Sequence, residues 1–233
     1  MTAVLEIKRL DAFYGDSHVV HGADLKVEEG EVATLLGRNG AGKTTMLRAI
    51  TGVLNKRRGS IRIRGSETIN LPPHHVARLG VGYVPEERGI FASLTVEENL
   101  LLPPKIAEGG MTLPELYALF PNLEERRTSY GTKLSGGEQQ MLAIARILRT
   151  GSRLILLDEP TEGLAPVIIE QIAAAVAKLK ALGFTVLLVE QNLRFVRSVA
   201  DRHYLVEDGQ VIDAIPESDI DARMEEVQAC LGV

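Results

Sequence analysis

The sequence of 233 residues predicts an α/β fold with a mostly parallel sheet. Three observations lead to this prediction. Short apolar runs rich in β-branched residues recur along the chain, and in the C-terminal half they alternate with longer segments of helical periodicity. A glycine-rich turn follows one of these runs and opens a helix, which is the arrangement of a phosphate-binding loop in such folds.

The composition indicates a globular protein with one large domain. Hydrophobic residues make up 45% of the chain, which is enough for a substantial core. The net charge of -5 argues against binding to nucleic acid or to anionic lipid. The single cysteine, Cys230, excludes an intrachain disulfide framework and fits a reducing compartment. No run reaches membrane-spanning length and the start lacks the apolar core of a signal peptide, so we expect a cytoplasmic protein that meets a membrane only through a partner.

Strand signals are spread over both ends of the chain. The pair Asp208-Gly209 separates the last two runs and is suited to a hairpin turn. The expected strands cover residues 5–10, 19–27, 32–36, 60–64, 81–84, 154–157, 185–189, 203–206 and 210–214.

Helical signals replace strand signals between Glu87 and Thr150. We therefore expect a helical subdomain, residues 87–150, inserted into an α/β core of residues 1–86 and 151–233, all within a single domain. Periodicity is clearest after Leu134 and again from Ala165 to Gly183, where Pro166 lies near the start. The acidic tail, residues 216–233, is predicted to be a packing helix, with a dimer contact as the alternative.

The stretch "GRNGAGKT" follows a predicted strand and opens a helix, as a P-loop does. Its glycines let backbone N–H groups converge on phosphate oxygens, and the helix N-terminus adds a favourable dipole. Lys43 is expected to reach the β- and γ-phosphates, and the Thr44 hydroxyl to bind Mg²⁺. A glycine-rich turn without a ligand is the alternative. The candidate nucleotide-binding residues here are Gly37, Arg38, Asn39, Gly40, Ala41, Gly42, Lys43, Thr44 and Thr45.

The stretch "RLILLDEP" delivers two carboxylates at the end of a predicted strand. Asp158 is placed to hold Mg²⁺, and Glu159 to orient and polarise an attacking water as general base. Two acids at a strand end can instead cap the next helix. A P-loop in the same chain weakens that alternative, because hydrolysis needs both a metal anchor and a group that positions water.

The stretch "LSGGEQQ" predicts a second anion site. Ser135, Gly136 and Gly137 would present backbone N–H groups at a helix N-terminus. Ser135 and Glu138 also form the pattern of a capping box, so an ordinary capped helix is the simpler interpretation, and both can hold at once. A P-loop kinase would transfer phosphate to a small molecule and has no need of this second site.

With these three motifs in this order, the chain resembles the nucleotide-binding domain of ATP-binding cassette proteins from end to end. The resemblance implies a P-loop NTPase core, an N-terminal antiparallel β subdomain and an inserted helical subdomain. It also implies that the signature stretch of one subunit closes over the ATP and Mg²⁺ held by another. The signature residues expected to contact ATP in this way are Leu134, Ser135, Gly136, Gly137, Glu138 and Gln139.

Four further positions take roles from this resemblance. Tyr14 matches the aromatic residue that stacks on adenine, although an ordinary core or surface tyrosine is a serious alternative. Glu86 stands where the family usually has a glutamine that senses γ-phosphate, and as a carboxylate it can accept from water or bind Mg²⁺. Gln191 replaces the usual histidine at γ-phosphate and cannot exchange a proton. Ala165 replaces a common interface Asp.

These departures resemble one branch of the family, the ATP-binding subunits of importers for branched-chain amino acids and related polar solutes. That branch implies a heterodimer with a paralogue, or a homodimer, bound to two permease subunits at the cytoplasmic face of the inner membrane. A periplasmic or lipid-anchored solute-binding protein would act indirectly. The alternatives are a lipid or lipopolysaccharide export ATPase and a soluble cassette switch protein. Neither the solute nor the equivalence of the two ATP sites can be predicted from this chain.

Overall fold

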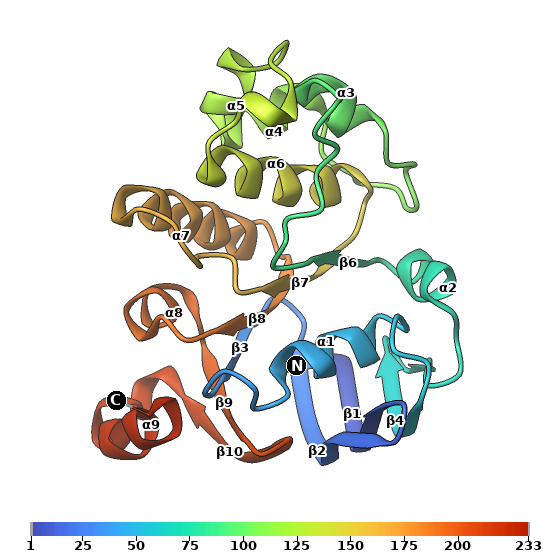
Figure 1. The fold of residues 1–233 in the computed structure, drawn as a ribbon, viewed down its shortest axis with the longest axis vertical. Helices are drawn as coiled ribbons and strands as arrows, with labels where there is room; N and C mark the ends of the chain where they lie inside the picture. The colour runs from blue at the N-terminus through green and yellow to red at the C-terminus, as the bar shows by residue number, and fades with distance from the viewer. Residues whose placement is uncertain (1, 233) are drawn as a thin grey trace.

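The computed structural model describes residues 2–232. Its centre is a six-stranded sheet in the order β10-β9-β3-β8-β7-β6 (Figure 1). All neighbouring pairs are parallel except β10 with β9 at one edge, so the prediction of a mostly parallel sheet is confirmed. The strands are β3 (Val32–Leu36), β6 (Val81–Val84), β7 (Leu154–Asp158), β8 (Thr185–Glu190), β9 (Arg202–Glu207) and β10 (Gln210–Pro216).

A second, antiparallel sheet is built from the N-terminal part of the chain, in the order β2-β1-β4-β5. β5 is only two residues long, too short to leave a pattern in the sequence. β4 begins three residues before the expected Ser60, because Arg57 and Arg58 pair with β1 despite their polarity. The strands are β1 (Ala3–Tyr14), β2 (Ser17–Glu28), β4 (Arg57–Ile63) and β5 (Ser66–Glu67).

The central sheet is covered on both faces. In β8, Val186 and Leu188 belong to one hydrophobic core while Leu187 and Val189 belong to another, because successive strand residues face opposite ways. One core is completed by the antiparallel sheet with α1 (Lys43–Ile50) and α2 (Pro73–Arg78). The other is completed by the remaining helices, among them α7 (Pro166–Ala181), α8 (Leu193–Val199) and α9 (Met224–Leu231).

Four helices lie in sequence between the adjacent strands β6 and β7 and form the upper part of the molecule in Figure 1. Three of them start with a capping box, formed by Thr95, Thr112 and Ser135 with the glutamate three residues later. The helices are α3 (Val96–Leu101), α4 (Leu113–Leu119), α5 (Pro121–Glu125) and α6 (Gly136–Arg149). Where a subdomain boundary falls stays a prediction. Short 3₁₀ helices cover Gly131–Lys133, Glu217–Asp219 and Asp221–Arg223.

The turn between β9 and β10 connects three parts of the fold. Asp208 and Gly209 both have positive φ, 45° and 77°, as the expected hairpin requires. The Gly209 N–H donates to the Ala41 carbonyl oxygen over 2.9 Å, and the Gly209 carbonyl oxygen accepts from the His21 N–H over 2.9 Å. We call this arrangement the Gly209 clasp. It ties the central sheet to the P-loop and to β2.

Helix α9 packs its apolar side, with Val227 and Cys230 buried, against the core beside β3 and β9. The Cys230 sulfur lies 3.6 Å from the Val206 carbonyl oxygen and 3.8 Å from that of Leu36, the residue just before the P-loop. Burial raises the pKa of this thiol. Within the predicted tail, residues Met224–Leu231 therefore form a packing helix, preceded by two short 3₁₀ helices.

Among residues 2–232, none of the helices combines the length and the hydropathy required to cross a bilayer.

Candidate functional site

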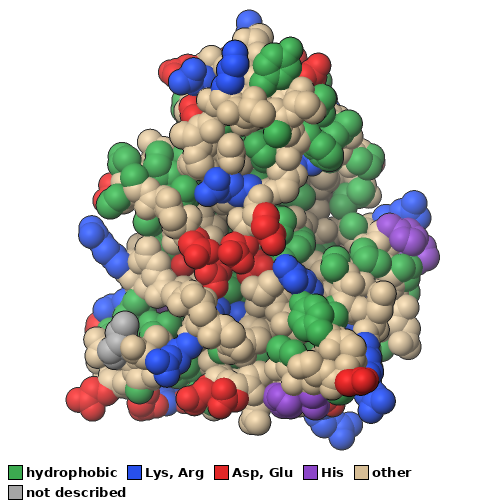
Figure 2. Space-filling model, viewed as in Figure 1, with side chains coloured by type: hydrophobic (Ala, Val, Ile, Leu, Met, Phe, Trp, Pro, Cys, Tyr) green, Lys and Arg blue, Asp and Glu red, His purple; other side chains and the backbone are tan. Residues whose placement is uncertain are grey.

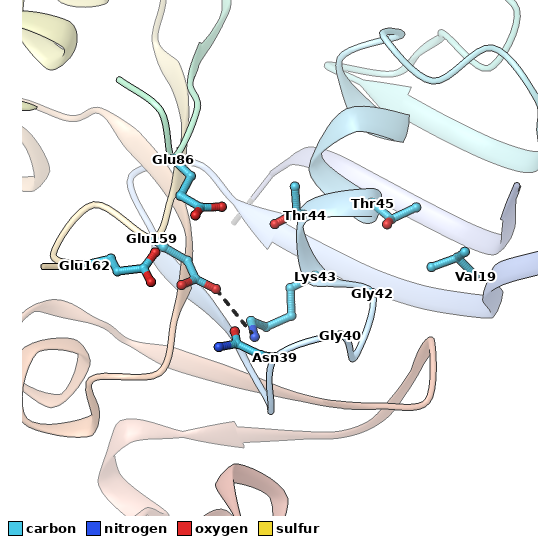
Figure 3. Close-up of a pocket in the computed structure, with 10 residues that line it drawn as sticks. All are labelled: Val19, Asn39, Gly40, Gly42, Lys43, Thr44, Thr45, Glu86, Glu159 and Glu162. Carbon is cyan, nitrogen blue, oxygen red and sulfur yellow. Dashed lines mark ion pairs between the residues drawn. The ribbon is translucent and has the colours of Figure 1, made fainter. Parts of the chain in front are cut away.

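A cavity of about 430 Å³ opens where the P-loop meets the ends of β6 and β7 (Figure 3). Its lining combines P-loop residues with three glutamates from other segments. Acidic side chains gather near the centre of this face of the molecule in Figure 2. The lining residues are Val19, Asn39, Gly40, Gly42, Lys43, Thr44, Thr45, Glu86, Glu159 and Glu162.

Sheet topology explains why these segments meet. The P-loop follows β3, Glu86 follows β6, Glu159 follows β7 and Gln191 follows β8. These four strands are parallel, so their carboxyl ends lie at the same edge of the sheet. This is the edge at which open α/β sheets bind ligands.

The P-loop backbone leaves donors free at the start of α1. Gly42 is the N-cap, has φ of 97° and makes no side-chain capping bond, so the first N–H groups of the helix have no side-chain acceptor there. Gly37 has no room for a side chain, because a Cβ atom would lie 2.2 Å from the Val206 carbonyl oxygen. A close, N–H-rich turn of this kind suits phosphate oxygens.

Lys43 is buried and folded over the P-loop. Its ammonium group donates to the carbonyl oxygens of Gly37, over 2.7 Å, and Arg38, over 2.9 Å. The nitrogen lies 3.8 Å from Glu159 Oε1 (dashed in Figure 3). Burial lowers the pKa of Lys43, and the charges of Glu159 and Asp158 oppose that shift. The ammonium is therefore the cation nearest to the glutamate expected to act as base.

Asp158 is held by two hydroxyl donors. Thr44 Oγ1 donates to Oδ1 over 2.9 Å, and Tyr83 OH donates to Oδ2 over 2.9 Å. Burial raises the pKa of Asp158, while these two hydrogen bonds oppose the rise. Hydroxyl and carboxylate oxygens are hard donors of the kind Mg²⁺ prefers. Thr44 and Asp158 would thus offer such oxygens to an ion. Within residues 2–232, no group of three or more His, Cys, Asp or Glu side chains is placed to hold a metal ion by itself.

Glu159 follows Asp158 in a left-handed backbone conformation, with φ of 44°. Burial raises the pKa of its carboxyl group, and the Lys43 charge opposes this. Gln191 Nε2 lies 3.4 Å from each Glu159 carboxylate oxygen and donates to Asn39 Oδ1 over 2.6 Å. The structure thus brings the residues expected at γ-phosphate together from three separate segments.

Glu86 and Glu162 face the same cavity from the loops after β6 and β7 (Figure 3). Burial raises the pKa of Glu86, and the neighbouring Glu162 carboxylate raises it further. Three carboxylates at one opening repel each other unless a cation or donor joins them. The cavity therefore carries positive charge on its P-loop side, from Lys43, and negative charge on the side of the loops after β6 and β7.

The signature stretch lies elsewhere. Ser135 caps α6 and accepts from the Glu138 N–H, while the Glu138 carboxylate accepts from the Ser135 N–H over 2.7 Å, so the expected capping box is present. Gly137 packs so tightly that a Cβ atom would lie 2.5 Å from the Ile168 side chain. None of the ten lining residues of the cavity comes from the signature stretch. Within one chain, the two predicted anion sites stay apart.

Several predicted site residues lie outside the cavity lining. Tyr14 is 42% exposed at the end of β1, where its hydroxyl accepts from Arg48 Nη1 over 3.2 Å. Leu134 is buried in the core, so its side chain is unavailable to a ligand. The Gln139 amide donates to the carbonyl oxygens of Gly131 and Leu134. Within the P-loop, Gly37, Arg38 and Ala41 also lie outside the lining.

The sequence alone assigned no role to four residues of this site. Val19 and Glu162 line the cavity, Tyr83 holds Asp158, and Glu190 accepts hydrogen bonds beneath Glu159 and Gln191. None of the four belongs to a contiguous phosphate-binding motif. Glu190 alone had a signal, since it ends the apolar run of β8 with a carboxylate.

Comparison with known proteins agrees with this geometry. The family model described as ABC transporter matches residues 20–162. The branched-chain amino acid transport ATP-binding protein BraG of Pseudomonas aeruginosa is 41% identical over 212 residues, covering 90% of this chain and 91% of that protein. The lipopolysaccharide export ATP-binding protein LptB of Escherichia coli is 37% identical over 216 residues, covering 90% and 89%.

A solved cassette gives the matching fold. It is described as the dimeric, post-hydrolysis state of an ATP-binding cassette bound to ADP and phosphate. The TM-score is 0.79 at 26% identity, and the match covers 91% of this chain and 98% of the other. This chain therefore belongs to the ABC transporter family, as an ATP-binding subunit that hydrolyses ATP.

Proposed function

We propose that this chain powers an importer for branched-chain amino acids or related polar solutes. The observation that carries this is the cavity lined by the P-loop, Glu86 and Glu159, with Asp158 hydrogen-bonded to Thr44 and Gln191 to Asn39 at its edge. It combines a complete hydrolytic set with the glutamate and glutamine that mark the importer branch. The 41% identity to BraG over most of both chains supports the same branch.

Residues in and around the cavity take the following roles in this proposal. Lys43 binds the β- and γ-phosphates once it leaves the P-loop carbonyl oxygens. Thr44 and Asp158, with Glu86 nearby, would hold Mg²⁺, which would supply positive charge against the phosphates. Glu159 takes a proton from the attacking water, while Gln191 donates from its amide to the γ-phosphate. Tyr14 stacks on the adenine.

The proposed catalytic unit is a dimer, with a paralogous subunit or with a second copy. Its support is the separation of the signature stretch from the cavity within one chain. Ser135, Gly136 and Gly137 would supply N–H donors to ATP held by the partner, as the family resemblance implies. Glu138 and Gln139 support the turn that presents those donors.

We further propose that two permease subunits hold this dimer at the cytoplasmic face of the inner membrane, where a solute-binding protein acts on it indirectly. Exposed apolar side chains on and beside α3 support a docking surface. Phe91, Leu101, Leu102 and Tyr130 are 45%, 46%, 51% and 50% exposed, and apolar side chains that gather on one surface are typical of interaction sites. These residues follow Glu86 in sequence. The segment between them would therefore connect the cavity to the permease.

The second candidate is lipopolysaccharide export, favoured by the 37% identity to LptB. A transport assay separates the two. The chain is reconstituted in vesicles with the permeases and the solute receptor encoded beside its gene. Under import, receptor loaded with a branched-chain amino acid raises ATP hydrolysis and drives solute uptake. Stimulation by lipopolysaccharide alone, with no solute effect, would establish the second candidate instead.

Substitution of Glu159 by Gln tests the catalytic assignment. The variant keeps the size and loses the basic carboxylate, so we expect kcat to fall at least ~100-fold while Mg-ATP still binds. Turnover is measured by phosphate release, and binding by a fluorescent ATP analogue. Turnover equal to that of the unmodified chain would show that Glu159 is not the base.

A further inference from the structure

Glu190 ends β8 with a buried carboxylate, 3% exposed, directly below the hydrolytic residues. Four donors point at it. Oε1 accepts from the Thr161 N–H over 3.0 Å and from the Thr161 hydroxyl over 2.7 Å. Oε2 accepts from the N–H groups of Gln191, over 3.1 Å, and Asn192, over 3.2 Å. One side chain therefore joins two loops.

The four partners are all donors toward Glu190. An ionised carboxylate has two oxygens that only accept, so this group satisfies all four in its charged form. Burial raises the pKa of Glu190, and the same hydrogen bonds oppose that rise. A buried carboxylate is costly in free energy unless its hydrogen bonds are formed. Glu190 therefore favours the one arrangement of the two loops in which all four hydrogen bonds are present.

The two joined loops carry the reacting groups. The loop from Glu159 to Thr161 presents the proposed base, and the loop from Gln191 to Asn192 presents the amide that lies 3.4 Å from it. The backbone of Glu159 is left-handed, which costs a non-glycine residue ~1–2 kcal/mol. Such a conformation persists only where its surroundings determine it.

The end of β8 supplies that restraint on both sides of the strained residue. The Glu159 N–H donates to the Val189 carbonyl oxygen over 2.9 Å, and Glu190 holds Thr161 two residues later. The chain between these anchors has little freedom. The direction of the Glu159 side chain is thus set largely by β8.

We propose that Glu190 is a positioning residue for ATP hydrolysis, whose carboxylate fixes the Glu159 loop relative to the Gln191 loop. The inference rests on the proposed role of Glu159. Glu190 itself is buried and does not line the cavity. Its loss would therefore act on the rate of the chemical step and leave the P-loop contacts to ATP in place.

The test substitutes Glu190 by Gln, which keeps the volume but leaves only one acceptor oxygen. Two donors on one side then lose their acceptor. A displacement of about 1 Å in a reacting group costs up to ~100-fold, so we expect kcat to fall roughly 10- to 100-fold. The dissociation constant for Mg-ATP should stay within about threefold of the unmodified value.

Glu31→Gln is the matched control. Glu31 is also a buried glutamate, 9% exposed, but it lies before β3, at the opposite end of the sheet from the cavity. It accepts from the Glu28 N–H and from Arg202 Nε, each over 2.7 Å. Its loss should lower thermal stability without lowering kcat. An equal kcat for Glu190→Gln and Glu31→Gln would overturn the proposal.

A gentler pair guards against misfolding. Thr161→Val removes only the hydroxyl that donates to Glu190, and Thr161→Ser restores it. Val keeps the shape of threonine and Ser keeps its hydroxyl. We therefore expect a reduced kcat for Thr161→Val and a kcat near the unmodified value for Thr161→Ser. If Thr161 acted only by packing, Thr161→Val would be the more active of the two. If Val and Ser behave alike, the link between the two loops does not act on catalysis. The kcat of Glu159→Gln is measured in parallel. If that kcat equals the unmodified value, Glu159 is not the base. If Glu159→Gln is inactive while Glu190→Gln keeps the unmodified kcat, the positioning role of Glu190 is wrong and the role of Glu159 stands.

Discussion

Gln191 places an amide where the family usually has an imidazole. The amide donates to Asn39 and approaches both oxygens of Glu159. An amide keeps the same donors and acceptors throughout the physiological pH range, whereas an imidazole changes charge near neutrality. In this chain the proposed γ-phosphate contact therefore does not titrate.

This predicts a pH profile without a histidine-type inflection for the assembled transporter. Burial raises the pKa of Glu159, and the base works as a carboxylate, so the rate should fall only as pH drops through that raised pKa. Gln191→His adds a group with an ordinary pKa of ~6.5 and should add an inflection there. The measurement is kcat against pH for both chains. Superimposable profiles would refute the idea.

Among single residues, those in contiguous motifs could be predicted from the sequence. Lys43, Thr44, Asp158 and Glu159 are found in this way, because their spacing along the chain is itself the signal. Tyr83 is not, since its role exists only because β6 and β7 are paired neighbours. A single residue whose partner lies 75 positions away leaves no local pattern.

Among the elements, the loop after β6 depends on one buried side chain. Asn99 is fully buried in α3 and accepts from the Phe91 N–H over 2.8 Å. Its amide donates to the carbonyl oxygens of Phe91, Leu94 and Thr95. This segment lies between the cavity and the proposed permease surface, so its shape affects both.

Asn99→Ala should destabilise the fold by ~2–4 kcal/mol, because it leaves several buried backbone groups without partners. The free energy of unfolding is measured by urea denaturation. Asn55→Ala, at an exposed position, is the control and should change it by less than ~0.5 kcal/mol. Equal changes in the free energy of unfolding for the two variants would mean that water replaces the lost hydrogen bonds.

The same variant also tests coupling to the permease. If Asn99→Ala lowers solute transport more than it lowers basal ATP hydrolysis, Asn99 takes part in the coupling to the permease.

Element boundaries were less predictable than element types. The buried strands β3 and β6 begin and end where the apolar runs do, since both faces are covered. Helices α2 and α8 were not foreseen, because six or seven residues with one to three buried positions give too little periodicity. The charged start of β4 is likewise decided by pairing with β1 rather than by its own composition.

Across the whole molecule, the Gly209 clasp holds two sheets and the P-loop in one arrangement. A Cβ atom at Gly209 would lie 2.0 Å from the Val19 carbonyl oxygen, and Val19 also lines the cavity. The antiparallel sheet and the central sheet thus share a fixed junction beside the cavity.

Gly209→Ala should therefore unfold far more readily than Gly183→Ala. Both glycines have φ of 77°, but a Cβ atom at Gly183 meets nothing within 4 Å. Backbone strain alone predicts ~1–2 kcal/mol for Gly183→Ala, while the clash at Gly209 adds enough to exceed ~3 kcal/mol. Thermal and urea unfolding measure both. Similar losses in the free energy of unfolding for the two variants would show that the structure around Gly209 accommodates a Cβ atom without strain.

The clasp and helix α9 also bear on the order in which the site is assembled. The P-loop lies early in the sequence, whereas its supports, Gly209 at Ala41 and Cys230 beside Leu36, follow long after it. A nascent chain that already contains Lys43, Asp158 and Glu159 therefore still lacks both contacts. We expect its P-loop to reach the shape described above only after Cys230 has been added.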